Sequence, residues 1–232
     1  MQLSKRLETV AGMVQSGGVV ADVGCDHGFT SIFLVQKDLA KKAVAMDINP
    51  GPIERAREHI AQYEMEDRIE TRLSDGLDGL TAGEADTILI SGMGGALMRR
   101  ILERGEDVVQ SCRELVLSPQ SENHLVRMKI QESGFAIDRE EMLLDQGKYY
   151  VVIHAVPGEQ HFSREEEYTY GKDLIDRKHP VLVEYLEKER NRLAGILERM
   201  PDDGLSEQAE EQFRQLSQQK EQIRDLLIRM RA

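Results

Sequence analysis

Short apolar runs alternate with helical patterns over the first half of the chain, and this alternation limits the possible fold more than any other feature. Five runs have the length and composition of buried strands, at residues 19–23, 42–48, 68–73, 85–90 and 114–117. Helical patterns separate most of them, with connections of a few residues. Repeated β-α units predict a doubly wound sheet, because parallel neighbours need a crossover connection. We therefore expect an α/β fold, preceded by a helix over residues 3–15 that Ser16-Gly17-Gly18 ends.

A different pattern follows the fifth run. Residues 135–144 and 149–156 read as strands, and Asp145-Gln146-Gly147-Lys148 joins them as a four-residue turn. A short connection that contains glycine predicts an antiparallel hairpin. A parallel sheet that ends in such a hairpin is typical of Class I methyltransferases and unlike the plain six-stranded dinucleotide fold. We expect a Rossmann-like, mostly parallel sheet of seven strands.

The composition changes after about Pro157, where the chain becomes polar and charged. We expect one domain over residues 1–157 and a second, helical domain over residues 158–232. Apolar residues of the second part recur at heptad-like spacing on two stretches, which Pro201-Asp202-Asp203-Gly204 separates. The stripe positions are Leu182, Leu186, Leu193, Leu197 and Met200, then Phe213, Leu216, Lys220, Ile223, Leu227 and Met230. They predict an α-helical coiled-coil hairpin, which either packs or dimerises, or else binds substrate.

Charge and cysteine content exclude several classes of protein. The formal net charge of −12 argues against a polyanionic partner unless the basic residues gather locally. Cys25 and Cys112 lie far apart in the sequence, so we expect neither a disulfide framework nor a zinc site. We expect a reduced, cytoplasmic setting. No apolar run approaches 18 residues, and the N-terminal stretch lacks the apolar core of a signal peptide. We expect no membrane contact and no metal.

Small or acidic residues stand where four of the five parallel strands end: Gly24, Asp47, Asp75 and Gly92. Ligands of open α/β sheets bind at the carboxyl ends of the strands, near the point where the strand order reverses. Asp47 can accept hydrogen bonds from both ribose hydroxyls of a nucleoside, and Asp75 from an adenine amino group. Each acid could instead be an ordinary turn former. Their recurrence on one edge of one sheet favours binding.

The first of these turns reads Gly24-Cys25-Asp26-His27-Gly28. Dinucleotide-binding turns expose bare backbone N–H groups to a pyrophosphate. Here Asp26 stands where that motif has glycine, and its carboxylate would repel a diphosphate. The turn better suits a ligand with a positive centre, such as S-adenosylmethionine, which carries a sulfonium and an ammonium group. Alternatively, Asp26 caps the following helix.

Several segments resemble the bacterial tRNA (adenine-22-N1)-methyltransferase family (TrmK), whose members are Class I S-adenosylmethionine-dependent enzymes. DVGCDHG is similar to the methyltransferase motif DxGxGxG, with Asp26 in place of the middle glycine. The wider resemblance is carried by LSKRLETVA (3–11), VADVGCDHGF (20–29), AMDINPGPIERA (45–56), ISGMGG (90–95) and LVLSPQ (115–120), and it covers essentially the whole chain. It implies a cytoplasmic enzyme that transfers a methyl group from S-adenosyl-L-methionine to N1 of adenine 22 in tRNA.

The resemblance also implies the site. It places Asp22, Gly24, Asp26, His27, Asp47, Ile48, Asp75 and Gly76 in the cofactor pocket, and we extend this expectation to Cys25, Gly28, Asn49, Gly92, Met93 and Gly94 of the same turns. Asp26 and His27 are the catalytic candidates, as a base for the N6 proton of the methylated adenine, although His27 could serve only in packing. Candidates for tRNA binding are Arg99, Arg100, Arg104 and Lys178, with Arg127 and Lys129 as further basic residues. Any of these could instead be a partner of a surface glutamate.

Three other functions remain open from the sequence. The acidic charge would suit a methyltransferase that acts on a small metabolite. The helical hairpin would suit a non-catalytic scaffold. The third function, an NAD-dependent oxidoreductase, is disfavoured by Asp26 and by the terminal hairpin. We expect a monomer or a weak homodimer.

Overall fold

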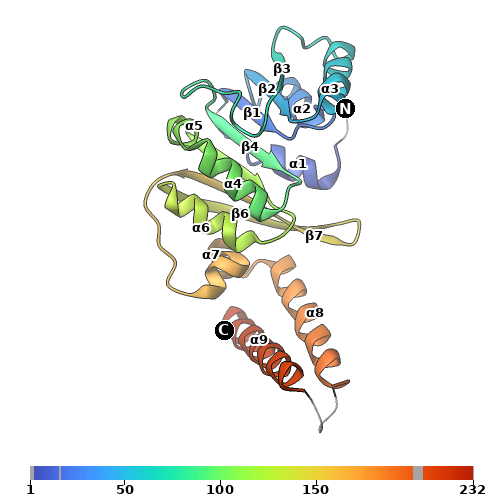
Figure 1. Cartoon of the computed structure of the whole chain (residues 1–232), viewed down its shortest axis with the longest axis vertical. Helices are drawn as coiled ribbons and strands as arrows, with labels where there is room; N and C mark the ends of the chain where they lie inside the picture. The colour runs from blue at the N-terminus through green and yellow to red at the C-terminus, as the bar shows by residue number, and fades with distance from the viewer. Residues whose placement is uncertain (1–2, 16, 201–205, 232) are drawn as a thin grey trace. The chain divides into compact units, whose positions relative to one another are not determined.

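The computed structural model describes residues 3–15, 17–200 and 206–231. Contacts divide the chain into two compact units, Met1–Asp173 (the sheet unit) and Leu174–Ala232 (the C-terminal unit). The sheet unit contains one seven-stranded sheet with the order β3-β2-β1-β4-β5-β7-β6 (Figure 1). Its strands are β1 Val19–Val23, β2 Lys42–Asp47, β3 Ile69–Leu73, β4 Thr87–Ser91, β5 Glu114–Ser118, β6 Phe135–Asp145 and β7 Lys148–Pro157. The expected Rossmann-like methyltransferase sheet is confirmed.

The central strands explain why this sheet forms. β1 pairs in parallel with both β2 and β4, and β4 pairs in parallel with β5. Since β1, β4 and β5 have helices or strands on all sides, their side chains are almost continuously buried rather than alternating. The strand order reverses between β1 and β4, so a ligand crevice is expected at their carboxyl ends.

Helices cover both faces of the sheet. Figure 1 shows α4 and α6 side by side on one face, with α1, α2 and α3 on the other. The helices are α1 Lys5–Ala11, α2 Phe29–Gln36, α3 Pro50–Gln62, α4 Gly95–Arg104, α5 Glu106–Ser111 and α6 Asn123–Glu132. The expectation of a helix over residues 3–15 is wrong at both ends: Ser4 is its N-cap, and Gly12 ends it. Met13 and Val14 are buried beyond that end, which is why the apolar pattern continues there, while Ser16 lies outside the described residues.

The β6–β7 hairpin is longer and its turn tighter than the sequence suggested. Gln146 and Gly147 have φ values of +48° and +80°, so they form a two-residue turn instead of the expected four-residue one. Two residues with positive φ give the turn whose twist matches that of paired strands. Because β7 pairs with β5 only through residues 153–155, the tip of the hairpin extends past the carboxyl end of β5.

The segment between the hairpin and the C-terminal unit packs with the sheet unit. It contains a π-helix, η1 Glu167–Gly171, whose Tyr168 and Thr169 carbonyl oxygens accept hydrogen bonds of 2.7 and 3.0 Å from Arg127. The compact units therefore divide after Asp173, whereas the sequence pattern placed the boundary after Pro157. The composition changes at Pro157, but the chain leaves the sheet unit later because these carbonyl groups bind a buried arginine.

The C-terminal unit contains α8 Pro180–Leu197 and α9 Glu207–Arg231, which pack against each other and are preceded by α7 Lys172–Asp176 at the unit boundary (Figure 1). Most of the expected stripe is buried: Leu182, Leu186, Leu193, Ile223, Leu227 and Met230. Phe213 is 39% exposed, so the stripe expected for α9 is wrong at that position. The expected turn at residues 201–204 lies outside the described residues, and the coiled-coil character stays a prediction.

Candidate active site

Two cavities open at the carboxyl ends of the parallel strands. The large cavity has a volume of about 510 Å³, which is within the range of small-molecule sites. Its lining includes seven of the expected cofactor-binding residues: Gly24, Asp47, Ile48, Asn49, Asp75, Gly76 and Met93. Leu97, Arg100, Ile101 and Arg104 of α4 form part of its wall, as do Ser74, Leu77 and Asp78 after β3. The topology thus brings together residues that are up to about eighty positions apart.

The small cavity, of about 340 Å³, shares Gly24 with the large one. Five further expected residues line it: Asp22, Cys25, Asp26, His27 and Gly92. Gly28 and Gly94 line neither cavity and instead stand at helix starts, as N-caps of α2 and α4. The lining also contains Arg6, Ser91 and Gln120, which were not predicted from the sequence. All three lie inside the segments that carry the family resemblance.

The turn after β1 is fixed by backbone geometry. The N–H groups of Gly24 and Cys25 both donate to the carbonyl oxygen of Met46, at 2.8 and 2.9 Å, which ties the turn to the end of β2. Gly24 has a φ of +76°, and a Cβ there would lie 2.2 Å from Cε of Met93. Glycine is favoured at this position because the backbone is left-handed, whereas the close atom is the end of the flexible Met93 side chain and can move.

Asp26 does not cap the helix that follows it. The N-cap of α2 is Gly28, without a side-chain hydrogen bond, so the capping alternative is wrong. The Asp26 carboxylate is 65% exposed and lies 3.3 Å from the Arg55 guanidinium. It is therefore a solvent-accessible carboxylate at the rim of the small cavity.

Asp22 is a buried acid at the floor of the same cavity. Its Oδ2 accepts a hydrogen bond of 2.7 Å from the Ser31 hydroxyl, and its exposed fraction is 3%. Burial raises the pKa of the Asp22 carboxyl to about 6, and the Ser31 hydrogen bonds only partly offset this effect. A cationic ligand nearby would favour the ionised form.

The two other acids of the strand ends differ in their partners. Asp47 Oδ1 accepts a hydrogen bond of 2.9 Å from the Asn49 N–H, and among the described residues no lysine or arginine pairs with Asp47. Asp75, in contrast, has a basic partner: its Oδ2 lies 2.7 Å from Nη1 of Arg104. The same arginine also contacts Asp78. Asp47 shapes its own turn and both acids line the large cavity, so for Asp47 the two interpretations of the sequence are compatible.

His27 belongs to a stack of three rings. Its ring centroid lies 5.6 Å from that of Phe29, which in turn lies 4.5 Å from that of His59. His59 Nδ1 is hydrogen-bonded to the His27 carbonyl oxygen at 2.9 Å. His27 Nδ1 is buried and has no hydrogen-bond partner among the described residues, while Nε2 is 3.5 Å from Asp26. The stack fixes the ring beside the cavity, and a catalytic role for Asp26 or His27 stays a prediction.

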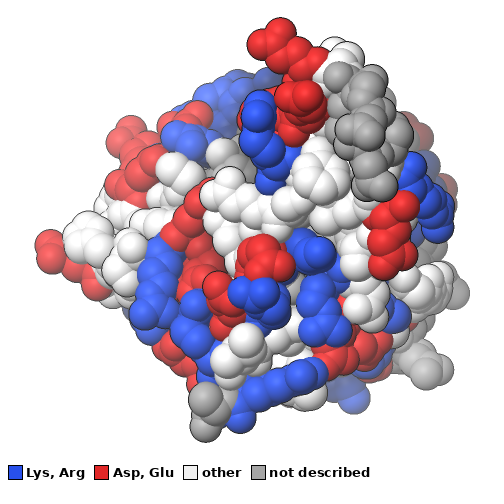
Figure 2. Space-filling model, turned by 90° about the horizontal axis from the view of Figure 1, so that it is seen from below, with Lys and Arg blue, Asp and Glu red and all other residues white. Residues whose placement is uncertain are grey.

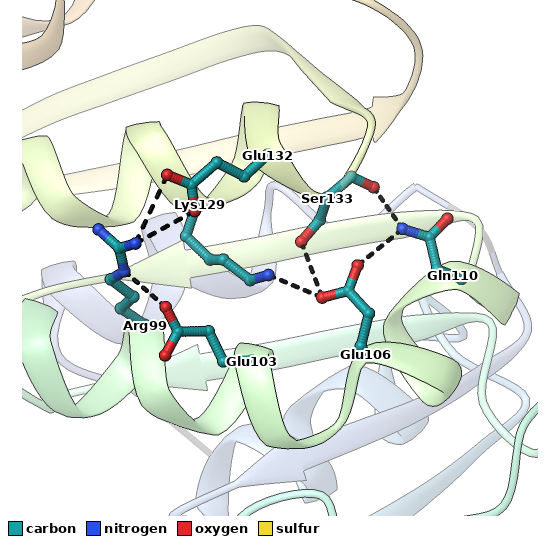
Figure 3. A network of polar contacts seen from close by, with 7 residues as sticks. All are labelled: Arg99, Glu103, Glu106, Gln110, Lys129, Glu132 and Ser133. Atoms are coloured by element: carbon teal, nitrogen blue, oxygen red, sulfur yellow. Dashed lines mark hydrogen bonds and ion pairs between the residues drawn. The ribbon is translucent and has the colours of Figure 1, made fainter.

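The expected tRNA-binding residues fall into different environments. Figure 3 shows Arg99 between Glu103 and Glu132, at 2.7 and 3.3 Å, and Lys129 at 2.7 Å from Glu106. These contacts join α4, α5 and α6 on one face of the sheet. Two of the candidate cations, Arg99 and Lys129, are thus paired with neighbouring glutamates. Pairing with a surface glutamate is the alternative to tRNA binding that the sequence left open.

The remaining basic candidates lie elsewhere. Arg100 and Arg104 line the large cavity, and Lys178 lies in the C-terminal unit. Arg127 is fully buried and pairs with Glu140 at 2.8 Å, so its expected place among phosphate-binding residues is wrong. On the face seen in Figure 2, basic side chains are interspersed with acidic ones. Figure 2 therefore gives no support to a uniformly basic surface among the residues described on that face.

Fold and site together define a class of protein. The sheet has seven strands and ends in an antiparallel hairpin, and acids stand at the carboxyl ends of β1, β2 and β3. The turn after β1 has Asp26 where a dinucleotide-binding turn has glycine. These are the features of a Rossmann-like methyltransferase. A family model described as a methyltransferase domain matches residues 3–153.

Comparisons with individual proteins narrow this class. The tRNA (adenine(22)-N(1))-methyltransferase of Bacillus subtilis (strain 168) is 30% identical over 232 residues, which cover 98% of each chain. The crystal structure of the B. subtilis m1A22 tRNA methyltransferase TrmK matches with a TM-score of 0.86, at 30% identity over 97% of this chain and 99% of that one. Sp1610 of Streptococcus pneumoniae, solved in complex with S-adenosyl-L-methionine, matches with a TM-score of 0.87, at 30% identity over 97% and 100%. The chain belongs to the tRNA (adenine(22)-N(1))-methyltransferase family.

Proposed function

We propose that this protein transfers a methyl group from S-adenosyl-L-methionine to N1 of adenine 22 in tRNA. The observation that carries the proposal is the acid-lined cavity at the ends of β1 to β4. It lies in a chain that aligns over almost its whole length with a tRNA (adenine(22)-N(1))-methyltransferase. The reaction is inferred from the family, and the role of each residue is inferred from its place in this structure.

The donor chemistry of the cavities fits this cofactor. Asp47 is a carboxylate without a basic partner among the described residues, which suits two ribose hydroxyls. Asp75 suits an adenine amino group, and Asp22 and Asp26 suit the ammonium and sulfonium charges. A pyrophosphate would meet the carboxylate of Asp26, so the same residues fit a dinucleotide poorly.

When bound, the cofactor supplies an electrophilic methyl carbon. The protein then contributes mainly orientation and a suitable electrostatic field. Adenine N1 has a free lone pair, so no residue need remove a proton before the attack. We assign to Asp26 and His27, which line the small cavity, the role of accepting the N6 proton as the product loses its positive charge.

The turn between β4 and α4 fits a ring nitrogen as the methyl acceptor. It reads Ser91-Gly92-Met93-Gly94-Gly95 and contains neither an acid nor an aromatic ring. Enzymes that methylate exocyclic amino groups of DNA bases place such groups here to bind the amino hydrogens and stack the base. N1 lies on the Watson–Crick edge, so adenine 22 must be unpaired or turned out of its stack to react.

The proposal extends to the cellular location of the enzyme and to its oligomeric state. Within the described part of the chain, every helix is too short or too polar to cross a membrane. A tRNA substrate would place the enzyme in the cytoplasm, acting as a monomer or weak homodimer that takes up no metal. Basic residues outside the carboxylate networks, Arg100 and Lys178 among them, would contact tRNA phosphates, and affinity would fall steeply with salt.

The test is methyl transfer from labelled S-adenosylmethionine to total tRNA, with the modified nucleoside identified after digestion. We expect 1-methyladenosine in an unmodified tRNA transcript and none in a transcript that carries guanine at position 22. The runner-up, a small-metabolite methyltransferase, is favoured by the acidic net charge. It would replace this proposal if the cofactor bound while no tRNA was methylated.

A further inference from the structure

Arg6 is held at the small cavity by three parts of the sheet unit. Its Nη1 donates a hydrogen bond of 2.6 Å to the Ser91 hydroxyl, at the end of β4. The guanidinium carbon lies 5.5 Å from the ring centroid of Tyr150, on the overhanging part of the β6–β7 hairpin. The Arg6 backbone N–H donates to Asp145 Oδ2 at 3.2 Å, next to the hairpin turn. The Arg6 side chain, which is otherwise flexible, is thus held at the small cavity by Ser91 and Tyr150.

The charge of Arg6 is not neutralised within the described residues. No carboxylate lies within ion-pair distance of it, in contrast to the guanidinium groups of Arg55, Arg99, Arg104 and Arg127. A guanidinium has five N–H donors in a planar fork that matches a carboxylate or a phosphate. Ser91 uses one of them, and an aromatic ring does not replace an anion.

The small cavity has one cationic and two acidic positions. Arg6 is the only lysine or arginine among its described lining residues, and Asp22 and Asp26 are its acids. An α-amino acid presents an ammonium group and a carboxylate a few bonds apart. The lining therefore has the charge pattern that would bind such a zwitterion.

The other place for an anion, the N-terminus of α2, is already occupied. Asp22 accepts a hydrogen bond of 2.7 Å from the Ser31 hydroxyl and a further one from the Ser31 backbone, in the first turn of that helix. A ligand carboxylate at this helix end would lie close to Asp22 and be repelled by it. Arg6 offers the anion site without that conflict.

We propose that Arg6, which lines the small cavity, binds the carboxylate of the amino-acid end of S-adenosylmethionine and thereby positions the cofactor. This inference rests on the proposed function, since it needs that cofactor. A phosphate of the target nucleotide is the other oxyanion that a guanidinium could bind, and the experiment below separates the two.

The experiment compares two ligands by calorimetry. S-adenosylhomocysteine carries the amino-acid end, whereas 5′-methylthioadenosine lacks both its carboxylate and its ammonium group. Arg6→Gln should weaken binding of S-adenosylhomocysteine about ten- to a hundred-fold, as expected for loss of a charge-assisted hydrogen bond, and leave binding of 5′-methylthioadenosine unchanged. Arg6→Lys, which keeps the charge, should recover part of the loss. Arg113→Gln, at a 76%-exposed arginine outside both cavities, is the matched control.

Four outcomes oppose this expectation, and they are distinguishable. Equal binding of S-adenosylhomocysteine to Arg6→Gln and wild type overturns the inference. If the KM for tRNA rises instead, the oxyanion is a tRNA phosphate. A parallel loss for both ligands shows a merely structural role. If the wild type itself does not bind S-adenosylhomocysteine, the proposed function fails rather than the role of Arg6.

Discussion

Arg104 and Asp75 form an ion pair in the lining of the large cavity, with 2.7 Å between Nη1 of the arginine on α4 and Oδ2 of the acid that follows β3. The acid that the sequence pattern assigned to adenine is therefore oriented by a residue that the same analysis assigned to tRNA. Both side chains are 49% exposed. An exposed pair adds little to the free energy of folding, so its consequence lies in ligand binding.

Arg104→Ala should therefore weaken binding of S-adenosylhomocysteine by roughly three- to ten-fold, because Asp75 loses its orientation, and change the free energy of unfolding by less than ~1 kcal/mol. Calorimetry and urea unfolding measure the two effects. Arg99→Ala is the matched control for cofactor binding, since Arg99 lies on the same helix but pairs with Glu103 and Glu132. An effect of Arg104→Ala confined to the KM for tRNA would instead support the tRNA-binding role.

Asp47 is expected to make the strongest single polar contact with the cofactor. A carboxylate that accepts two ribose hydroxyl groups contributes roughly 1.5–3 kcal/mol through each charged hydrogen bond, less the cost of its desolvation. Asp47→Ala should raise the Kd for S-adenosylhomocysteine at least ten-fold. The Kd of Asp47→Asn should lie between those of the wild type and Asp47→Ala. Asp67→Ala, an exposed acid after α3, is the control. An unchanged Kd for Asp47→Ala would place the ribose elsewhere.

The sequence was sufficient to predict the sheet, and most of the predicted cofactor-binding residues line the two cavities. Strand ends in a parallel sheet share one edge, so acids and glycines at residues 24, 47, 75 and 92 had to converge once the strands were identified. This part of the site follows from topology alone. The large cavity indeed joins the residues that follow β1, β2, β3 and β4.

Contacts between distant segments could not be predicted in this way. Arg6 and Ser91 are 85 positions apart and belong to no common periodic pattern. Arg127 looked like a surface cation on an amphipathic helix, yet it is buried because Glu140 and two carbonyl groups of η1 surround it. The segment after Pro157 supplies those carbonyl groups, and because they belong to the backbone, no side-chain pattern signals this contact.

The buried Arg127–Glu140 pair leads to a stability prediction. Both side chains have an exposed fraction of 0%, and removing one partner leaves an uncompensated buried charge. Glu140→Ala should lower the free energy of unfolding by roughly 3–5 kcal/mol, measured by urea denaturation. Glu132→Ala, which breaks the half-exposed contact to Arg99, should cost at most ~1 kcal/mol. Similar losses for both variants would contradict the assignment of Arg127 as a structural residue.

Asp22 links stability to pH. Its carboxyl has a pKa of about 6 in the folded protein, against an ordinary value of 3.8, because burial disfavours the charged form. The folded state therefore binds more protons than the unfolded state between these two values. Stability must fall as pH rises through this window, and above it the buried charge costs on the order of 3 kcal/mol.

Asp22→Asn removes that cost while an amide oxygen can still accept the Ser31 hydrogen bond, whose length is 2.7 Å in the wild type. At pH 8 we expect the variant to unfold at a higher temperature than the wild type, and at pH 4 we expect the difference to shrink. The variant should also bind S-adenosylhomocysteine more weakly, since it loses a negative charge beside the ligand ammonium group. Thermal unfolding from pH 4 to 8, with Asp67→Asn as the control, measures the first effect. A constant difference in melting temperature across this range would show that Asp22 does not titrate between pH 4 and 8. It would contradict the raised pKa of this carboxyl.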